Sequence, residues 1–103
     1  MRPIHLARID KIRPVVVLTR EIARPHLSMV TVASITSRIR GHATEVPVGA
    51  SNGLDHDSVV NLDGVTTIHV SDLGEQIGFL LDSQEDALVK AIHAAFDLDD
   101  VRT

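Results

Sequence analysis

Short apolar runs follow one another along most of the chain, with the period of β-strands rather than of helices. Residues 14–19 (Pro-Val-Val-Val-Leu-Thr) are apolar and mostly β-branched, which predicts a strand buried on both faces. Residues 29–33 alternate apolar and polar, and the alternation continues to Arg40, with Ile35 and Ile39 on the expected inward side. Further strands are expected at residues 4–9, 44–48, 58–62 and 65–70.

The period changes to that of a helix only near the end of the sequence. Ser83 and Asp86 are spaced as a capping box, with Ser83 as the expected N-cap. The apolar positions that follow fall on a single stripe: Leu88, Ile92, Ala95 and Phe96. The chain is therefore expected to be mainly β, a small β-barrel followed by a C-terminal α-helix.

The composition narrows the class of protein. The chain of 103 residues suits a single domain, residues 1–103. It contains no cysteine, which excludes disulfides, thiolate nucleophiles and cysteine-based zinc sites and suits a reducing cytoplasm. Apolar stretches such as residues 15–18 are too short to cross a membrane, and the N-terminus lacks the apolar segment of a signal peptide. We therefore expect a cytoplasmic protein without membrane contact.

The charges are divided unevenly along the chain. Residues 1–40 carry eight Lys and Arg against two Asp and Glu, a net charge of +6, whereas residues 41–103 carry two against twelve, or −10. This asymmetry favours an anionic partner such as nucleic acid on one face; the alternative is that the two halves neutralise each other across the fold. Phe79 and Phe96 are the only aromatic residues of the chain among Phe, Trp and Tyr, which argues against a platform for stacking bases.

Two segments carry a resemblance to a known family. The first is Arg13-Pro14 followed by the apolar run 15–18, and the second is the segment 34–39 with Thr36 near its centre. Supporting matches follow in order at residues 44–48, 53–54, 57–60, 65–68 and 72–73. In this order and spacing the chain resembles the MazF/PemK-type toxins of type II toxin–antitoxin systems.

The resemblance implies a fold, a reaction and partners. The fold is an SH3-like antiparallel β-barrel that forms a homodimer. The reaction is sequence-specific cleavage of single-stranded RNA, with no metal or other cofactor, leaving 2′,3′-cyclic phosphate and 5′-hydroxyl ends. The inhibitor is a cognate MazE-like antitoxin that occupies the RNA groove. Arg13 and Thr36 stand at the positions of the family's catalytic pair.

The chain departs from the family pattern in two places. The loop between the first two strands is shortened to residues 10–12, so that the acidic helper of that loop is missing or is replaced by Asp10. Gly64 and Thr66 stand where the family often has Gln and Arg. These departures bear on the RNA sequence preference rather than on the class of reaction.

The residue types suit this chemistry. The guanidinium of Arg13 can fork onto phosphate oxygens, and the hydroxyl of Thr36 can donate to a non-bridging oxygen. We expect Arg38 and Arg40 to hold flanking phosphates, and Lys11, Ser37 and His42 complete the predicted RNA-binding set. Each residue also has a plainer interpretation. Arg13 would form a surface ion pair with Asp10, and Thr36 would be an exposed strand threonine. Arg38 and Arg40 would lie on a solvated strand edge.

The general base stays open between two kinds of residue. Asp10 is one candidate, and His42 and His56, which lie in predicted loops, are the other. The six histidines of the chain never lie three or four positions apart, so no metal site is expected.

Two other functions compete with RNA cleavage. The first is a gyrase inhibitor of the CcdB type, which shares the fold; the absence of Trp from a chain that ends Val101-Arg102-Thr103 counts against it. The second is a decayed toxin that acts only as an antitoxin-binding module, which the presence of both Arg13 and Thr36 argues against.

Overall fold

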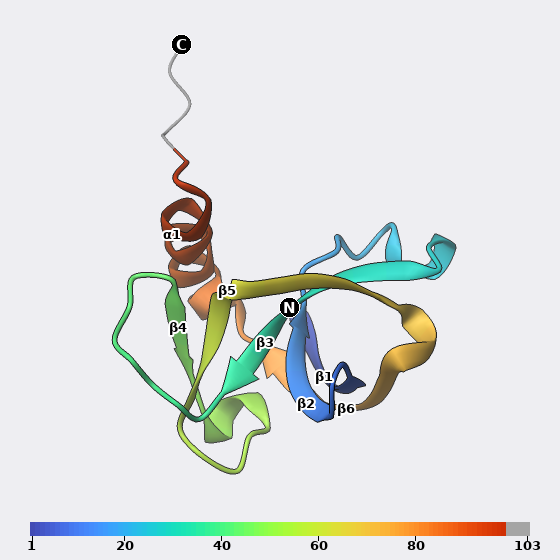
Figure 1. The fold of residues 1–103 in the computed structure, drawn as a ribbon, viewed down its shortest axis with the longest axis horizontal. Coiled ribbons are helices and arrows are strands. Elements are labelled where there is room, and N and C mark those ends of the chain that lie inside the picture. Colours follow the sequence, from blue (N-terminus) through green and yellow to red (C-terminus); the bar gives the residue numbers. More distant parts are fainter. Residues whose placement is uncertain (99–103) are drawn as a thin grey trace.

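A computed structural model describes residues 1–98 as one curled antiparallel sheet with a helix at the end of the chain (Figure 1). The six strands have the order β4-β5-β3-β2-β1-β6, so that β4 and β6 are the two edges. The sheet is curled into a half-barrel, and the mainly β fold with a closing helix is confirmed. The strands are β1 (Arg2–Arg8), β2 (Ile12–Val17), β3 (Met29–Thr36), β4 (Glu45–Val48), β5 (Ser58–His69) and β6 (Leu73–Leu80), and the helix is α1 (Glu85–Phe96).

The strand β2 is buried on both faces, as its apolar run predicts. Val16 belongs to a core that α1 closes through Leu88 and Ala91. Val15 and Val17 point to the opposite face and belong to a second core with Val30, Val32 and Ile68. The curl of the sheet around these two cores leaves the start of β2 and the end of β3 together at one rim.

The strand β5 is continuous where two strands were expected. Its register against β3 shifts between Ala33, opposite Val65, and Ser34, opposite Asn61. Residues 62–64 have no partner on β3, so the strand bends there as β-bulges do. Because of this bend, β5 contributes Val60 to the helix-side core and Ile68 to the other, and it runs across the sheet toward β6 in Figure 1.

The strand β6 was not predicted. Its sequence, Leu-Gly-Glu-Gln-Ile-Gly-Phe-Leu, lacks a clear alternation, and glycine is a poor strand residue. The strand forms because it pairs with β1 along the sheet edge, from Arg2–Leu80 to Ala7–Leu73. A short 3-10 turn, Val70–Asp72, precedes this strand.

The strand β3 ends at Thr36, four residues before the predicted end at Arg40. One cause lies in the neighbouring strand. Its partner β5 begins at Ser58, next to the last pair of Thr36 with Val59, so no strand lies beyond it. The expected inward position of Ile39 is therefore wrong, and this side chain is 55% exposed.

The start of the helix also differs from the prediction. Ser83 is not the N-cap: a 3-10 turn covers Asp82–Gln84, and α1 begins at Glu85. Gln84 is the N-cap residue of α1 by position, and its side chain closes the 3-10 turn instead: its Oε1 accepts hydrogen bonds from the Leu81 N–H at 2.9 Å and from buried Asn52 at 2.7 Å. The helix ends at Phe96, the last residue of the predicted apolar stripe. In the described part of the chain, no helix is long and apolar enough to cross a membrane.

Candidate active site

Arg13 and Thr36 face each other at the rim of the sheet. The antiparallel register of β2 and β3 pairs Val15 with Ser34, and continuing it by two residues places Arg13 opposite Thr36. Directly opposed side chains lie on the same face of a sheet, with Cβ atoms roughly 4.5–5.5 Å apart. The two residues are 23 positions apart in the sequence and are brought together by the pairing of their strands.

The guanidinium of Arg13 is held by Asp10. Its Nε donates to Asp10 Oδ1 at 2.9 Å and its Nη2 donates to Oδ2 at 3.1 Å. Asp10 also accepts the N–H of Lys11 at 2.8 Å, which fixes the carboxylate in the β1–β2 turn. A guanidinium has five N–H donors, so the two that Asp10 takes leave most of the fork available to a phosphate.

The ion pair has a clear electrostatic effect. Hydrogen bonds from Arg13 and from the local backbone lower the pKa of the Asp10 carboxyl well below its usual range. In turn, Asp10 raises the pKa of Arg13. The plainer interpretation of Arg13 as a partner of Asp10 is therefore correct as geometry, and it is compatible with a role in binding an anion.

The hydroxyl of Thr36 is oriented by the chain that follows it. Its Oγ1 accepts the backbone N–H of Arg38 at 3.1 Å. The oxygen is therefore fixed by an accepted hydrogen bond, while its proton remains available for donation to a ligand. The same bond turns the backbone out of the strand, which helps to explain why β3 ends at Thr36.

Arg13 and Thr36 line a cavity of about 290 Å³ that we call the arginine cavity. It collects most of the predicted RNA-binding residues, although Arg38, Arg40 and His42 come from the loop after β3 rather than from the strand. Among residues 1–98, neither Arg38 nor Arg40 lies within ion-pair distance of a carboxylate. These unpaired guanidinium groups beside Arg13 suit an anionic ligand.

Glu45 organises the arginine cavity and was not predicted. Its carboxylate accepts the backbone N–H of Gly41 at 2.8 Å and those of Arg40 and His42 at 3.3 Å. Gly41 has φ +77°, a conformation that glycine adopts readily. The carboxylate thereby stabilises the loop that carries the cations. The signal available in the sequence was Gly41 followed four positions later by an acid at the start of a strand.

A second cavity, which we call the hairpin cavity, lies on the other face of the sheet. It measures about 560 Å³ and shares Arg13, Ile35 and Thr36 with the arginine cavity. The predicted RNA-binding residues Lys11 and Ser37 line it. All predicted site residues except Asp10 therefore line one of two cavities that meet at Arg13 and Thr36, and Asp10 is bonded to Arg13.

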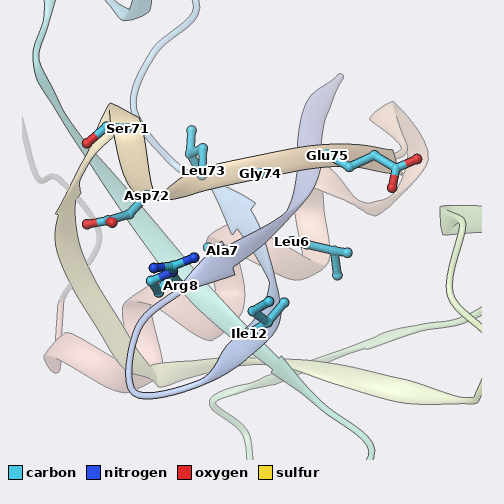
Figure 2. Close-up of a pocket in the computed structure, with 9 residues that line it drawn as sticks. All are labelled: Leu6, Ala7, Arg8, Ile12, Ser71, Asp72, Leu73, Gly74 and Glu75. Carbon is cyan, nitrogen blue, oxygen red and sulfur yellow. The ribbon is translucent and has the colours of Figure 1, made fainter.

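A third cavity extends this surface along the β1–β2 hairpin. It measures about 380 Å³ and shares Leu6 and Ile12 with the hairpin cavity. Figure 2 shows these two apolar side chains at one end, and Arg8, Ser71 and Asp72 at the other. The three cavities are therefore contiguous: the arginine and hairpin cavities meet at Arg13, and the third cavity adjoins the hairpin cavity at Leu6 and Ile12.

Not all the cations of residues 1–40 are free for a ligand. Arg2 forms an ion pair with Glu85 at 2.7 Å and donates to the carbonyl of Leu18. The N-terminal amine lies 3.3 Å from Asp82. Neutralisation across the fold therefore occurs at this end of the sheet, away from the Arg13 rim. Among the described residues, no group of three or more His, Asp or Glu side chains could hold a metal ion.

Known proteins resemble the chain along nearly its full length. The family of PemK-like, MazF-like toxins of type II toxin–antitoxin systems matches residues 3–96. The endoribonuclease MazF3 of Mycobacterium tuberculosis (strain ATCC 25618 / H37Rv) is 65% identical over 99 residues, which cover 96% of each chain. The probable endoribonuclease MazF5 of the same strain is 41% identical over 94 residues, covering 90% of this chain and 85% of its own.

The solved structures agree with these matches. Mycobacterium tuberculosis toxin MazF-mt6 has a TM-score of 0.94 and 64% identity, covering 95% of this chain and 99% of its own. A mycobacterial endoribonuclease in complex with its antitoxin has a TM-score of 0.85 at 20% identity, covering 96% of this chain and 95% of its own. This similarity shows a shared fold. The chain therefore belongs to the family of PemK-like, MazF-like toxins of type II toxin–antitoxin systems.

Proposed function

We propose that the chain is a toxin that cleaves single-stranded RNA at specific sequences, leaving 2′,3′-cyclic phosphate and 5′-hydroxyl ends without a metal ion. The observation that carries the proposal is that Arg13 and Thr36 line one cavity together with the unpaired cations Arg38 and Arg40. The relatives that are 65% and 41% identical, named endoribonuclease and probable endoribonuclease, support the reaction class.

The rim offers what the reaction requires of a protein. The nucleophile, the 2′-hydroxyl, belongs to the RNA, and its attack on phosphorus builds negative charge on the non-bridging oxygens. The free N–H groups of Arg13 and the hydroxyl of Thr36 stabilise that charge. Arg38 and Arg40 bind neighbouring phosphates and hold the strand in place.

The partners follow from the same family membership. We propose that the toxin is a cytoplasmic homodimer inhibited by a cognate MazE-like antitoxin. Complexes of MazE with MazF from Deinococcus radiodurans share the fold, with a TM-score of 0.76 at 18% identity. Phe79, Val89 and Phe96 are 40–54% exposed, and such large apolar side chains gain from burial against another chain. The cysteine-free composition suits the cytoplasm.

No observation favours the competing functions. The full-length relatives are named endoribonucleases rather than gyrase inhibitors. Arg13 and Thr36 are not only retained but also juxtaposed and oriented, which argues against a decayed toxin.

The direct test is to incubate the purified toxin with a long RNA in EDTA and to map the ends. Cleavage at a defined sequence with 2′,3′-cyclic phosphate ends is the expected result. RNA that stays intact while gyrase is stalled would instead support the CcdB-type alternative. RNA that stays intact although a MazE-like antitoxin still binds would support a decayed toxin.

If Arg38 and Arg40 contact phosphates, RNA affinity should depend less on salt concentration when either is removed. Arg38→Ala or Arg40→Ala should each weaken RNA binding and reduce the slope of log K against log salt by about 0.7, because one fewer cation is released from the strand per lost contact. Fluorescence anisotropy with an uncleavable RNA at several salt concentrations measures this slope. Lys90→Ala, which removes an exposed charge on α1, is the control and should leave the slope unchanged. Unchanged slopes in both Arg variants would show that these side chains do not contact phosphates.

A second prediction concerns the effect of Asp10 on the cleavage rate and on its pH dependence. Because its pKa is lowered, the carboxylate stays ionised above the ordinary pKa of aspartate, and the pair with Arg13 is lost only as the pH falls through the lowered value. An exposed, ionised carboxylate of this kind positions Arg13 and is a weak base. Asp10→Asn should therefore reduce the cleavage rate by only about two- to fivefold. The pH–rate profile between pH 5 and 9 should keep its shape; a rate loss of about 10²-fold or more would instead identify Asp10 as the base.

A further inference from the structure

The proposed reaction leaves two proton transfers without assigned groups. We propose that His42 and His56, which line the two cavities on opposite sides of the Arg13–Thr36 pair, are the acid–base pair of RNA cleavage. This inference rests on the proposed function and deepens it. One imidazole takes the proton of the 2′-hydroxyl, and the other gives a proton to the departing 5′-oxygen.

The two cavities are on opposite faces of the sheet. Successive side chains of a strand point to opposite faces. Of these two cavities, Leu6 and Pro14, which are paired across β1 and β2, line only the hairpin cavity and have the parity of Val16, whereas Ser34 lines only the arginine cavity and is paired with Val15. The cores confirm the two faces, because Val15 and Val16 belong to different clusters. Arg13 and Thr36 line both cavities at the rim where the cavities meet, so a phosphate that they bind there lies between the two cavities.

Each cavity contains one histidine. His42 lines the arginine cavity, and His56 lines the hairpin cavity. The backbone of each is anchored: the His42 N–H donates to Glu45, and the His56 carbonyl accepts the Ser58 hydroxyl at 3.0 Å. Within residues 1–98, no protein group bonds to either imidazole ring. Both exposed rings are therefore available to RNA.

The stereochemistry of the reaction needs this arrangement. When the 2′-oxygen attacks in line, it enters on the side of phosphorus opposite to the leaving 5′-oxygen, so the base and the acid must stand on opposite sides of one phosphate. Imidazole is the side chain whose ordinary pKa suits both roles near neutral pH. Asp10 suits neither role: the hydrogen bonds from Arg13 lower the pKa of its carboxyl, so the carboxylate is a weak base and carries no proton to give.

The step balances without any co-reactant. The 2′-oxygen loses its proton to the neutral imidazole as the bond from this oxygen to phosphorus forms. The bond from phosphorus to the 5′-oxygen breaks, and the protonated imidazole on the other side supplies the proton of the new 5′-hydroxyl. The products are the cyclic phosphate and the 5′-hydroxyl, and the two histidines end with their protonation states exchanged.

Charged side chains line both histidine cavities and influence the two imidazole rings. Arg13, Arg38, Arg40 and Glu45 line the cavity of His42. Lys11, Arg13 and Asp55 line the cavity of His56. Apart from these, the described residues place no titratable group in either cavity.

The test compares cleavage kinetics of His42→Ala and His56→Ala under single-turnover conditions. Each should lower the saturating rate by about 10²–10⁴-fold. Each should also remove one limb of a bell-shaped pH–rate profile, while the dissociation constant of an uncleavable RNA changes much less. Loss of affinity with an unchanged saturating rate would overturn the proposal and leave the histidines as RNA contacts.

A modified RNA separates the two roles. When sulfur replaces the bridging 5′-oxygen at the cleavage site, the leaving thiolate needs no proton. The variant that lacks the acid should then cleave nearly as fast as the unsubstituted protein, and the variant that lacks the base should stay slow. If neither variant were rescued, the acid would be another group and the proposal would fail.

His26→Ala is the matched control, because His26 is exposed in a 3-10 turn outside both cavities. It should cleave at the unsubstituted rate with an unchanged pH profile. Cleavage that depends on Arg13 but on neither histidine would overturn this inference and leave the proposed function standing. Absence of any cleavage by the unsubstituted protein would instead overturn the proposed function.

Discussion

Arg13→Ala should lower the single-turnover cleavage rate by about 10²–10³-fold, the loss expected when one preorganised donor to the transition state is removed. Asp10 already orients the guanidinium of Arg13 through Nε and Nη2 at 2.9 and 3.1 Å and leaves its other N–H groups for a phosphate, so that the side chain needs little rearrangement. Its effect should therefore fall on the rate of the bound complex, with a smaller effect on RNA affinity. Rates measured at saturating toxin with a short RNA give this comparison directly.

Two further variants make the result specific. Arg13→Lys keeps the charge but loses the planar fork, so it should recover only part of the rate. Arg20→Ala removes an exposed arginine outside both cavities of the site and should cleave normally. A normal rate in Arg13→Ala, with the protein still folded, would remove Arg13 from the mechanism.

Leu88→Ala should destabilise the fold by about 2–5 kcal/mol, the usual cost of removing a fully buried leucine side chain. Leu88 is 1% exposed and is the largest side chain that α1 inserts into the helix-side core. Urea denaturation followed by circular dichroism measures the change in the free energy of unfolding. Because a homodimer is expected, the measurement needs a fixed protein concentration.

Val89→Ala is the matched control for this prediction. It lies at the next position of the same helix and is 45% exposed, so its truncation should change stability by less than about 0.5 kcal/mol. Similar losses in both variants would mean that α1 does not pack through the Leu88 face.

The fold could be predicted where burial follows a simple period. The apolar run of β2 indicates burial on both faces, and Val15, Val16 and Val17 are each at most 1% exposed. The strand β6 could not be predicted, because its formation depends on pairing with β1 rather than on its own sequence. The end of β3 escaped prediction for a similar reason: hydrogen bonds to the Thr36 hydroxyl and to the Glu45 carboxylate redirect the backbone, and periodicity does not register such bonds.

The candidate site was predictable in its members but not in its arrangement. The family resemblance singles out Arg13 and Thr36, and the register of β2 with β3 explains why residues so far apart in sequence meet. The loop geometry that carries Arg38 and Arg40 into the same cavity depends on Glu45 and on the positive φ of Gly41, which a strand pattern does not reveal. The placement of His56 in the same cavity as Arg13 requires the loop before β5 to fold against the β1–β2 hairpin.

The central claim is that Arg13 and Thr36 act on one and the same phosphate, and replacing single oxygens of that phosphate tests it most directly. Sulfur accepts hydrogen bonds poorly, so a non-bridging sulfur at the cleaved phosphate should slow the unsubstituted toxin. This slowing should shrink in Arg13→Ala when the sulfur replaces the oxygen that Arg13 contacts, and in Thr36→Ala when it replaces the oxygen that Thr36 contacts. It should persist in Arg38→Ala. A sulfur effect of the same size in Arg13→Ala, Thr36→Ala and the unsubstituted toxin would contradict the account.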